Sequence, residues 1–219
     1  MDGTLQKLDI LSEASQYDLA CACGTGKEDR RHRGLDGRWL YPVPLPRGGY
    51  SVLLKTLLSN CCSNDCKYCP FRADANARRC SLTPEETARI FMEYYRRHQV
   101  FGLFLSSGVI GTPDHTMQQL NAAAAILRRK YGFRGYVHLK IIPGASDAAV
   151  EEAVSLATAV SLNVETPGEK YFRKLSAAKN FNADIVRPIK LRYRDWETDR
   201  KSTRLNSSHS AKSRMPSSA

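Results

Sequence analysis

Three cysteines within a short stretch carry most of the chemistry that this sequence can suggest. They belong to the motif Cys62-Ser63-Asn64-Asp65-Cys66-Lys67-Tyr68-Cys69, which follows closely on the apolar run Ser51 to Leu58. Thiolates are the ligands that iron–sulfur clusters and zinc prefer. A ferredoxin-type [4Fe–4S] cluster takes four cysteines, so three would leave one iron open to a substrate or cofactor, as a catalytic zinc keeps one open position. The spacing therefore predicts a [4Fe–4S] cluster on Cys62, Cys66 and Cys69.

Other uses of the cysteines stay open at this point. A zinc knuckle could use the same three thiolates with Cys61 or Cys80 as the fourth ligand. Zinc sites usually pair two C-x₂₋₄-C units or add histidines, and no second pair with that spacing follows here. A disulfide framework is disfavoured, because the chain has seven cysteines, an odd number, and no signal peptide precedes them.

Alternating strand and helix patterns surround the motif. The predicted strands are Ser51 to Leu58, Gly102 to Leu105, Tyr136 to Ile142 and Val160 to Glu165. Apolar residues at helical spacing lie between them and after the last one. Thr83-Pro84-Glu85-Glu86 has the residues of a helix N-cap with a capping box, and Ser146 can cap a later helix. Strands that alternate with helices predict an α/β fold with a parallel sheet and right-handed crossovers.

Polar residues collect where these strands end. Ser106, Ser107 and Gly108 end the second strand, Lys140 lies late in the third, and Asn163 and Glu165 close the fourth. In a βα barrel the active site lies at the carboxyl ends of the strands. A buried strand keeps such groups only where they meet a partner, because unpaired buried polar groups cost free energy. Taken singly, each could instead be an outward-facing strand residue that touches a helix.

The cysteine motif, with the aromatic Tyr68 before its last cysteine, resembles the signature of the radical S-adenosylmethionine (SAM) superfamily. The resemblance implies a partial (β/α)6 TIM-like barrel, truncated here after about four βα units. It implies a [4Fe–4S] cluster and SAM as cofactors, with the open iron bound to the amino and carboxylate groups of SAM. The cofactor contacts that it implies are Tyr68 near the adenine, Ser106, Ser107 and Gly108 at the methionine amino group, Lys140 at the methionine carboxylate, and Asn163 and Glu165 at the ribose.

The same resemblance implies a radical reaction. An electron donor such as flavodoxin or ferredoxin reduces the cluster, which cleaves SAM to methionine and a 5′-deoxyadenosyl radical. The radical then takes a hydrogen atom from the substrate. The protein's share is to position the reactants and to tune the cluster.

A closer resemblance concerns three stretches, Leu103 to Val109, His138 to Ala145 and Tyr17 to Cys21. They are similar to a bacterial family of radical SAM proteins assigned to DNA modification or repair. That family implies a DNA substrate and a partner of the uracil-DNA glycosylase type. Two alternatives remain: a radical SAM enzyme that acts on RNA, a peptide or a metabolite, and a non-enzymatic nucleic-acid-binding module in which a metal only stabilises the loop.

Charge agrees with a polyanionic partner without requiring one. The chain has 33 Lys and Arg residues against 22 Asp and Glu, a net charge of +11. Arg78 and Arg79 follow the cysteine motif and are the candidate contacts to a nucleic-acid backbone. Basic pairs on the predicted helices are most simply explained as part of a solvent-exposed helix face.

Three regions are expected along the chain. For residues 1–49 we expect an N-terminal helix and a basic Gly- and Pro-rich arm, which is either an extended loop or partly disordered. For residues 50–194 we expect the radical SAM barrel, incomplete at its end. Residues 195–219 lose hydrophobic periodicity and resemble translated sequencing adapter, so they are excluded from the fold. A chain whose native part ends near residue 194 would lack the last two strands of the barrel. Since no transmembrane run or signal peptide is found, we expect a cytoplasmic protein.

Overall fold

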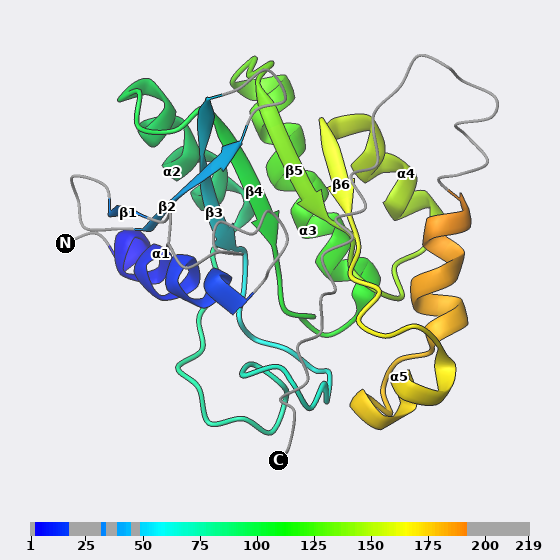
Figure 1. Ribbon diagram of the computed structural model, residues 1–219. Helices are drawn as coiled ribbons and strands as arrows, with labels where there is room; N and C mark the ends of the chain where they lie inside the picture. The colour runs from blue at the N-terminus through cyan, green and yellow to red at the C-terminus, as the bar shows by residue number, and fades with distance from the viewer. Residues whose placement is uncertain (1–2, 18–31, 34–38, 45–48, 192–219) are drawn as a thin grey trace.

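A parallel sheet forms the centre of the computed structural model (Figure 1). The structure describes residues 3–17, 32–33, 39–44 and 49–191. Its parallel strands pair in chain order and are β3 (Tyr50–Leu57), β4 (Gly102–Ser106), β5 (Tyr136–Lys140) and β6 (Ala159–Ser161). The predicted α/β fold with four parallel strands is confirmed.

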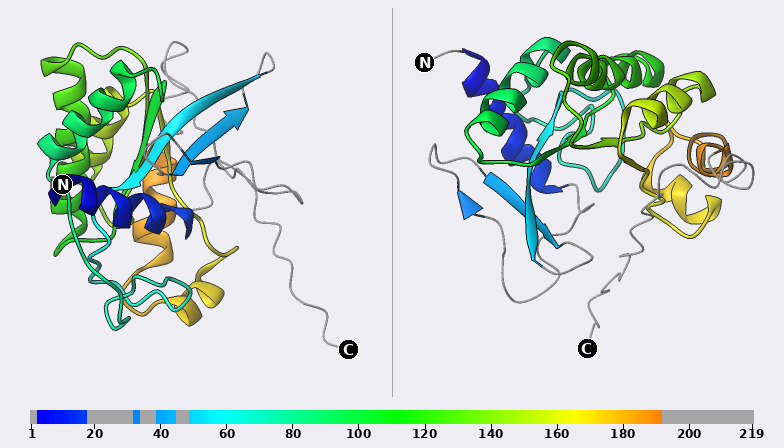
Figure 2. Two further views of the ribbon diagram at one scale, coloured as in Figure 1. Left: turned by 90° about the vertical axis from the view of Figure 1, so that its left-hand side faces the viewer. Right: turned by 90° about the horizontal axis from the view of Figure 1, so that it is seen from above.

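Helices cover one face of this sheet (Figure 2). They are α2 (Pro84–Arg96), α3 (Pro113–Ala125) and α4 (Asp147–Leu156), and the π-helical turn η2 (Ile126–Lys130) continues α3. Beyond β6, α5 (Glu169–Leu175) and the π-helical turn η3 (Phe181–Val186) follow. The side chains of Thr83 and Ser146 accept hydrogen bonds from the first turns of α2 and α4, so both predicted helix starts are confirmed.

The main core lies between the sheet and these helices. Alternate residues of β4 and β5, such as Leu103, Leu105 and Leu139, are fully buried in one apolar cluster with Phe91 of α2 and Met117 of α3. Apolar residues recur at every second position in the strands and at helical spacing in the helices, and these two apolar faces pack together. The spacing of apolar residues therefore located these elements in the sequence.

Two antiparallel strands extend the sheet at its β3 edge. β2 (Trp39–Pro44) pairs with β3, and β1 (His32–Arg33) pairs with Trp39 and Leu40 of β2. The sequence predicted an extended loop for this Pro-rich stretch, so the expectation was wrong for β2. Pro42 and Pro44 lie beyond the two residues of β2 that pair with β1 in the described part of the chain, which suits residues that have no N–H to donate to a neighbouring strand.

The last parallel strand is shorter than predicted. β6 ends at Ser161, whereas the sequence suggested a strand as far as Glu165. Glu165 has a positive φ of 62°, a left-handed conformation that no strand contains. Asn163 and Glu165 therefore lie on the loop after β6, still beyond its carboxyl end.

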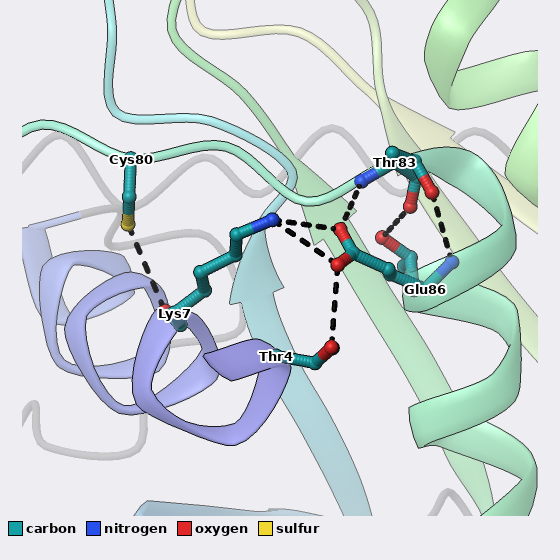
Figure 3. Close-up of polar contacts among 6 residues, drawn as sticks. Thr4, Lys7, Cys80, Thr83 and Glu86 are labelled. Carbon is teal, nitrogen blue, oxygen red and sulfur yellow. Dashed lines mark hydrogen bonds and ion pairs between the residues drawn. The ribbon is translucent and has the colours of Figure 1, made fainter. Parts of the chain in front are cut away.

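Helix α1 (Gly3–Ala14), followed by the 3₁₀ turn η1 (Ser15–Tyr17), packs against the sheet through Leu8 and Leu11, which are fully buried. Figure 3 shows how this helix is tied to the start of α2. The carboxylate of Glu86 accepts hydrogen bonds from Thr4 Oγ1 at 3.2 Å and from Lys7 Nζ at 3.1 Å. It also accepts from the backbone N–H of Thr83 at 2.8 Å, which completes the capping box.

The strand order β1-β2-β3-β4-β5-β6 is linear, so the sheet of the described residues is an open part of a barrel. The region 195–219, together with Cys21, Cys23 and most of the predicted basic arm, lies outside the described residues. No helix among the residues that the structure describes is long and apolar enough to cross a membrane.

Replacing Glu86 tests the joint between α1 and α2. We expect Glu86→Ala to lower the free energy of unfolding by about 1–2 kcal/mol at neutral pH, because the cap and the bonds to α1 are lost. Urea unfolding monitored by circular dichroism measures this. The matched control is Glu85→Ala, since Glu85 is exposed in the same first turn.

The same pair predicts a pH dependence. Burial opposes ionisation of Glu86, but the hydrogen bonds from Thr83, Lys7 and Thr4 outweigh it and hold the pKa of Glu86 below its ordinary 4.5. A depressed folded-state pKa stabilises the protein fully above the unfolded pKa, and this stabilisation is lost as the pH falls through the folded pKa. The stability gap between wild type and Glu86→Ala should therefore shrink below about pH 4.5. A gap that widens on acidification would contradict this.

Candidate functional site

A cavity lies at the carboxyl ends of the parallel strands and gathers residues from every βα unit. The predicted cluster ligands and cofactor contacts all line it, and they are Cys62, Cys66, Tyr68, Cys69, Ser106, Ser107, Gly108, Lys140, Asn163 and Glu165. The structure thus brings together side chains that are about 100 residues apart in the chain. Arg78 and Arg79 do not line this cavity.

The loop that carries the three cysteines (residues 58–82, the cysteine loop) starts and ends at one point. Ser59 and Ser81 form a β-bridge, and their hydroxyl oxygens are 2.7 Å apart. Asn60 is 1% exposed. Its side chain donates to the carbonyl of Arg78 and accepts from the N–H of Cys80, both at 2.8 Å. These bonds fix the base of the loop.

Arg79 holds the inside of the cysteine loop. Its guanidinium donates to the backbone carbonyls of Asn60 at 2.6 Å, Phe71 at 2.8 Å, Arg72 at 2.8 Å and Ala75 at 2.9 Å. Arginine suits this use because its planar group presents several donors at fixed angles. The sequence predicted a nucleic-acid contact for Arg79, whereas the structure commits its donors to the loop. Arg78 is exposed beside it, and its predicted contact stays a prediction.

Asp65 fastens the outer side of the same loop to the segment after α5. Its carboxylate accepts hydrogen bonds from the Ser176 hydroxyl, from the N–H of Ala177 at 2.8 Å and from the N–H of Ala178 at 3.3 Å. The backbone N–H of Lys67 donates to the carbonyl of Leu175 at 2.9 Å. The bonds from Ser176 and Ala177 lower the pKa of Asp65 to about 2, so the carboxylate is ionised at any ordinary pH.

The closest backbone approach in the site involves Gly108. A Cβ at this position would lie 2.5 Å from the carbonyl oxygen of Cys61 and 3.1 Å from Cβ of Cys62. The N–H of Gly108 donates to the carbonyl of Ser59 at 2.7 Å. Only glycine allows the end of β4 to lie this close to the cysteine loop.

The donor set fits an iron–sulfur cluster. Backbone N–H groups point at two of the sulfurs: those of Asn64 and Val109 lie 3.5 and 3.4 Å from Cys62 Sγ, and that of Phe71 lies 3.4 Å from Cys69 Sγ. Such bonds stabilise thiolates. Burial raises the pKa of the Cys69 thiol, the Phe71 N–H lowers it, and the other two thiols raise it. Binding of a cluster would therefore release protons.

Three sulfurs that bind separate irons do not have to converge on one point. Accordingly, no three Cys, His, Asp or Glu side chains among the described residues are arranged around a single ion position. Cys61 and Cys80, the alternative zinc ligands, do not line the cavity. The Cys80 thiol lies 3.8 Å from the carbonyl oxygen of Lys7 in α1 (Figure 3), and Ser81 Oγ lies 3.9 Å from Cys61 Sγ.

The opposite wall of the cavity comes from β5 and the loop after β6. Lys140 is only 6% exposed, and its ammonium group donates to Asn163 Oδ1 at 2.7 Å. Tyr68 is 49% exposed as a residue, while its hydroxyl lies beside the Glu165 carboxylate and the Cys66 thiol. Burial of this hydroxyl, and then these two neighbours, raise the pKa of Tyr68. The phenol is therefore a neutral donor.

The sequence missed other residues of the cavity. Lys179 lines it from the segment after α5, Asn64 from inside the motif and Tyr17 from the end of η1. The ring of Tyr17 contacts Phe71 edge-on, at 5.7 Å between centroids. Asn64 could have been proposed from its place in the motif. Lys179 carries no local signal, because its position depends on contacts far along the chain.

Replacing Gly108 tests directly how closely this residue lies to the cysteine loop. We expect Gly108→Ala to lower the free energy of unfolding by about 1–3 kcal/mol, because the new methyl group meets backbone atoms that cannot move aside cheaply. Iron retained after anaerobic reconstitution should fall as well. Gly168→Ala is the control, since a Cβ there meets nothing within 4 Å. Equal iron content in the two variants would contradict the packing argument.

Arg78 and Arg79 form a matched pair for the second test. Arg79→Met should destabilise the protein by about 1–3 kcal/mol and reduce bound iron, because the loop carbonyls lose their donor. Arg78→Met should leave both stability and iron content near the wild-type values. Thermal unfolding and iron analysis distinguish these outcomes. Equal behaviour of the two variants would mean that Arg79 does not organise the loop.

Comparison with solved structures identifies this arrangement as a known fold. HydG, a maturase of the [FeFe]-hydrogenase, aligns with a TM-score of 0.51 and 16% identity over 63% of this chain and 32% of its own. HydG from Carboxydothermus hydrogenoformans aligns with a TM-score of 0.50 and 22% identity, over 64% of this chain and 33% of its own. Methylornithine synthase (PylB) aligns with a TM-score of 0.52 and 18% identity, over 65% of this chain and 41% of its own. The chain thus spans about a third of the HydG chains. A comparison with curated proteins gave no match.

A family model agrees with the fold and with the cavity. The model described as the radical SAM superfamily matches residues 56–194, which is more than half of the chain. Enzymes of this superfamily use a [4Fe–4S] cluster and SAM, and the three cysteines described above suit the cluster. The chain therefore belongs to the radical SAM superfamily.

Proposed function

We propose that this protein is a radical SAM enzyme that cleaves SAM reductively at a [4Fe–4S] cluster held by Cys62, Cys66 and Cys69. One observation carries the proposal. The three motif cysteines line the same cavity as the buried ammonium of Lys140 and the polar residues that follow β4 and β6. A zinc knuckle that only stabilises a loop would have no use for that cavity.

Each wall of the cavity has a role in this proposal. The three thiolates hold three irons, and the fourth iron has no cysteine ligand. Lys140, oriented by Asn163, binds the methionine carboxylate, and the backbone of Ser106 to Gly108 accepts from the methionine amino group. Glu165 and Asn163 bind the ribose, and the exposed ring of Tyr68 can stack on the adenine.

Once bound and reduced, a cluster on these thiolates would supply the electron for the reductive cleavage of SAM. The chain's own residues orient SAM and keep water from the reacting groups. Val109, Ile141 and Ile142 supply apolar surface inside the cavity, and all three are largely buried. A dry, ordered site protects a reactive species from side reactions.

For the substrate we propose a nucleic acid, DNA in the first place, with a uracil-DNA glycosylase-type partner and a flavodoxin- or ferredoxin-type electron donor. The net charge of +11, of which +9 remains on residues 1–194 when the five basic and three acidic residues of the adapter-like stretch 195–219 are left out, supports a polyanion. So do the exposed side chains of Lys67 and Arg78 on the cysteine loop. The fold does not choose the substrate, since its solved relatives include a hydrogenase maturase and a methylornithine synthase. RNA, a peptide or a metabolite are the alternatives.

Cysteine variants test the activity. Wild-type protein, purified and reconstituted anaerobically, should bind about four irons per chain and release 5′-deoxyadenosine from SAM on reduction. Cys66→Ala should lose most of the iron and this product, whereas Cys80→Ala should retain both. A colourless zinc protein that leaves SAM intact, or Cys66→Ala with full iron content, would overturn the proposal.

The substrate is tested separately. Binding of single- and double-stranded DNA, RNA and an acidic peptide of matched charge is measured over a range of salt concentrations. Preference for DNA that persists at high salt supports the proposed substrate, because binding through phosphate charge alone weakens steeply with salt. Equal binding of the acidic peptide would contradict it.

A further inference from the structure

The contact between the cysteine loop and the segment after α5 joins the first βα unit to the fourth. Asp65 and Ser176 are 111 residues apart in the chain. The Asp65 carboxylate accepts three hydrogen bonds from consecutive residues, Ser176, Ala177 and Ala178. Ser176 is 2% exposed, so this contact (the Asp65 clasp) is partly shielded from water. The clasp fixes the backbone of the segment up to Ala178.

The next residue is Lys179, and the clasp determines where its side chain can go. Lys179 lines the cavity together with the three motif cysteines. Its ammonium group lies 5.6 Å from the centroid of the Phe172 ring, which supports the side chain from α5. Phe172 is itself 1% exposed, so this support is rigid.

The ammonium group of Lys179 does not pair with a carboxylate in the described part of the chain. No salt bridge involves it within the described residues, whereas Arg173 on the same segment pairs with Glu169. Its charge also acts on the Cys69 thiol, where it favours the thiolate. Among the described residues that line the cavity, Lys179 and Lys140 carry the cationic side chains, and Lys179 is the one whose charge acts on the cysteine motif.

We propose that the Asp65 clasp positions Lys179 so that its ammonium group balances the negative charge of the bound cluster and raises its reduction potential. This inference rests on the proposed function, because it requires a cluster on Cys62, Cys66 and Cys69. Three thiolates give a [4Fe–4S] cluster net negative charge, and reduction adds one more. A nearby cation stabilises the reduced form more than the oxidised form, and net charge is one of the factors that set cluster potentials. Asp65 is then a positioning residue that acts through Lys179.

Redox titration followed by electron paramagnetic resonance tests the role of Lys179. Lys179→Met keeps the length of the side chain and removes its charge, so the midpoint potential should shift to more negative values while the iron content stays near the wild-type value. Lys179→Arg keeps the charge and should restore the potential. The proposal is overturned if Lys179→Met has the wild-type potential, or if Lys179→Arg shifts as far as Lys179→Met.

The sign of the change in midpoint potential tests whether Asp65 acts through Lys179. Removal of a carboxylate near a cluster should by charge alone raise the potential. In wild type, Asp65→Ala should instead lower it, because Lys179 is no longer held in place. In the Lys179→Met background there is no cation to lose, so Asp65→Ala should raise the potential. The same sign in both backgrounds would show that the clasp does not act through Lys179.

If Asp65→Ala retains no cluster, Ser176→Ala tests the Asp65 clasp in its place. It removes one hydrogen bond of the clasp without any change of charge. We expect a smaller negative shift that disappears in the Lys179→Met background, and an unchanged potential would count against the clasp. If wild-type protein binds no iron–sulfur cluster, the proposed function fails. If it binds the cluster and these variants leave the potential unchanged, only the inference about Lys179 fails.

Discussion

The cysteine loop contains no helix and, apart from the Ser59–Ser81 bridge, no strand pairing, so the site depends on side chains that hold the loop in one shape. Asn60 and the Ser59–Ser81 bridge close its base, and Arg79 donates to four of its carbonyls. An unsatisfied buried carbonyl costs about 1–3 kcal/mol. Without these donors the loop would not keep one shape. A loop backbone that is already ordered lowers the entropic cost of bringing three thiols to one cluster.

This constraint explains why the loop is fastened on several sides. Gly108 at the end of β4 lies against the carbonyl of Cys61, and Asp65 ties the loop to the segment after α5. On a third side, the carbonyl of Lys7 in α1 accepts from the Cys80 thiol near the end of the loop, and the ammonium group of Lys7 pairs with Glu86 at the start of α2. The parallel sheet supplies the fixed frame for these contacts. The cavity forms where they meet, at the carboxyl ends of the strands.

Local signals explain what could be predicted. Strand periodicity, the Thr83 capping box and the cysteine spacing act within a few residues, and each was located from the sequence. Pro42 and Pro44 suggested a loop, because the sequence does not reveal that this stretch pairs with β3. Arg79 was expected at a phosphate, yet its partners are carbonyls of its own loop. Lys179 was missed because it follows a segment, Ser176 to Ala178, that is bonded to Asp65 more than 100 residues earlier in the chain.

The central claim is that three cysteines leave one iron of a cluster open to SAM inside this cavity. Electron paramagnetic resonance of the anaerobically reduced protein, recorded before and after addition of SAM, tests it most directly. The account predicts a [4Fe–4S] signal whose shape changes when SAM binds, because SAM becomes a ligand of the open iron. A cluster signal that SAM leaves unchanged, or the absence of any iron signal in a protein that binds zinc, would contradict it.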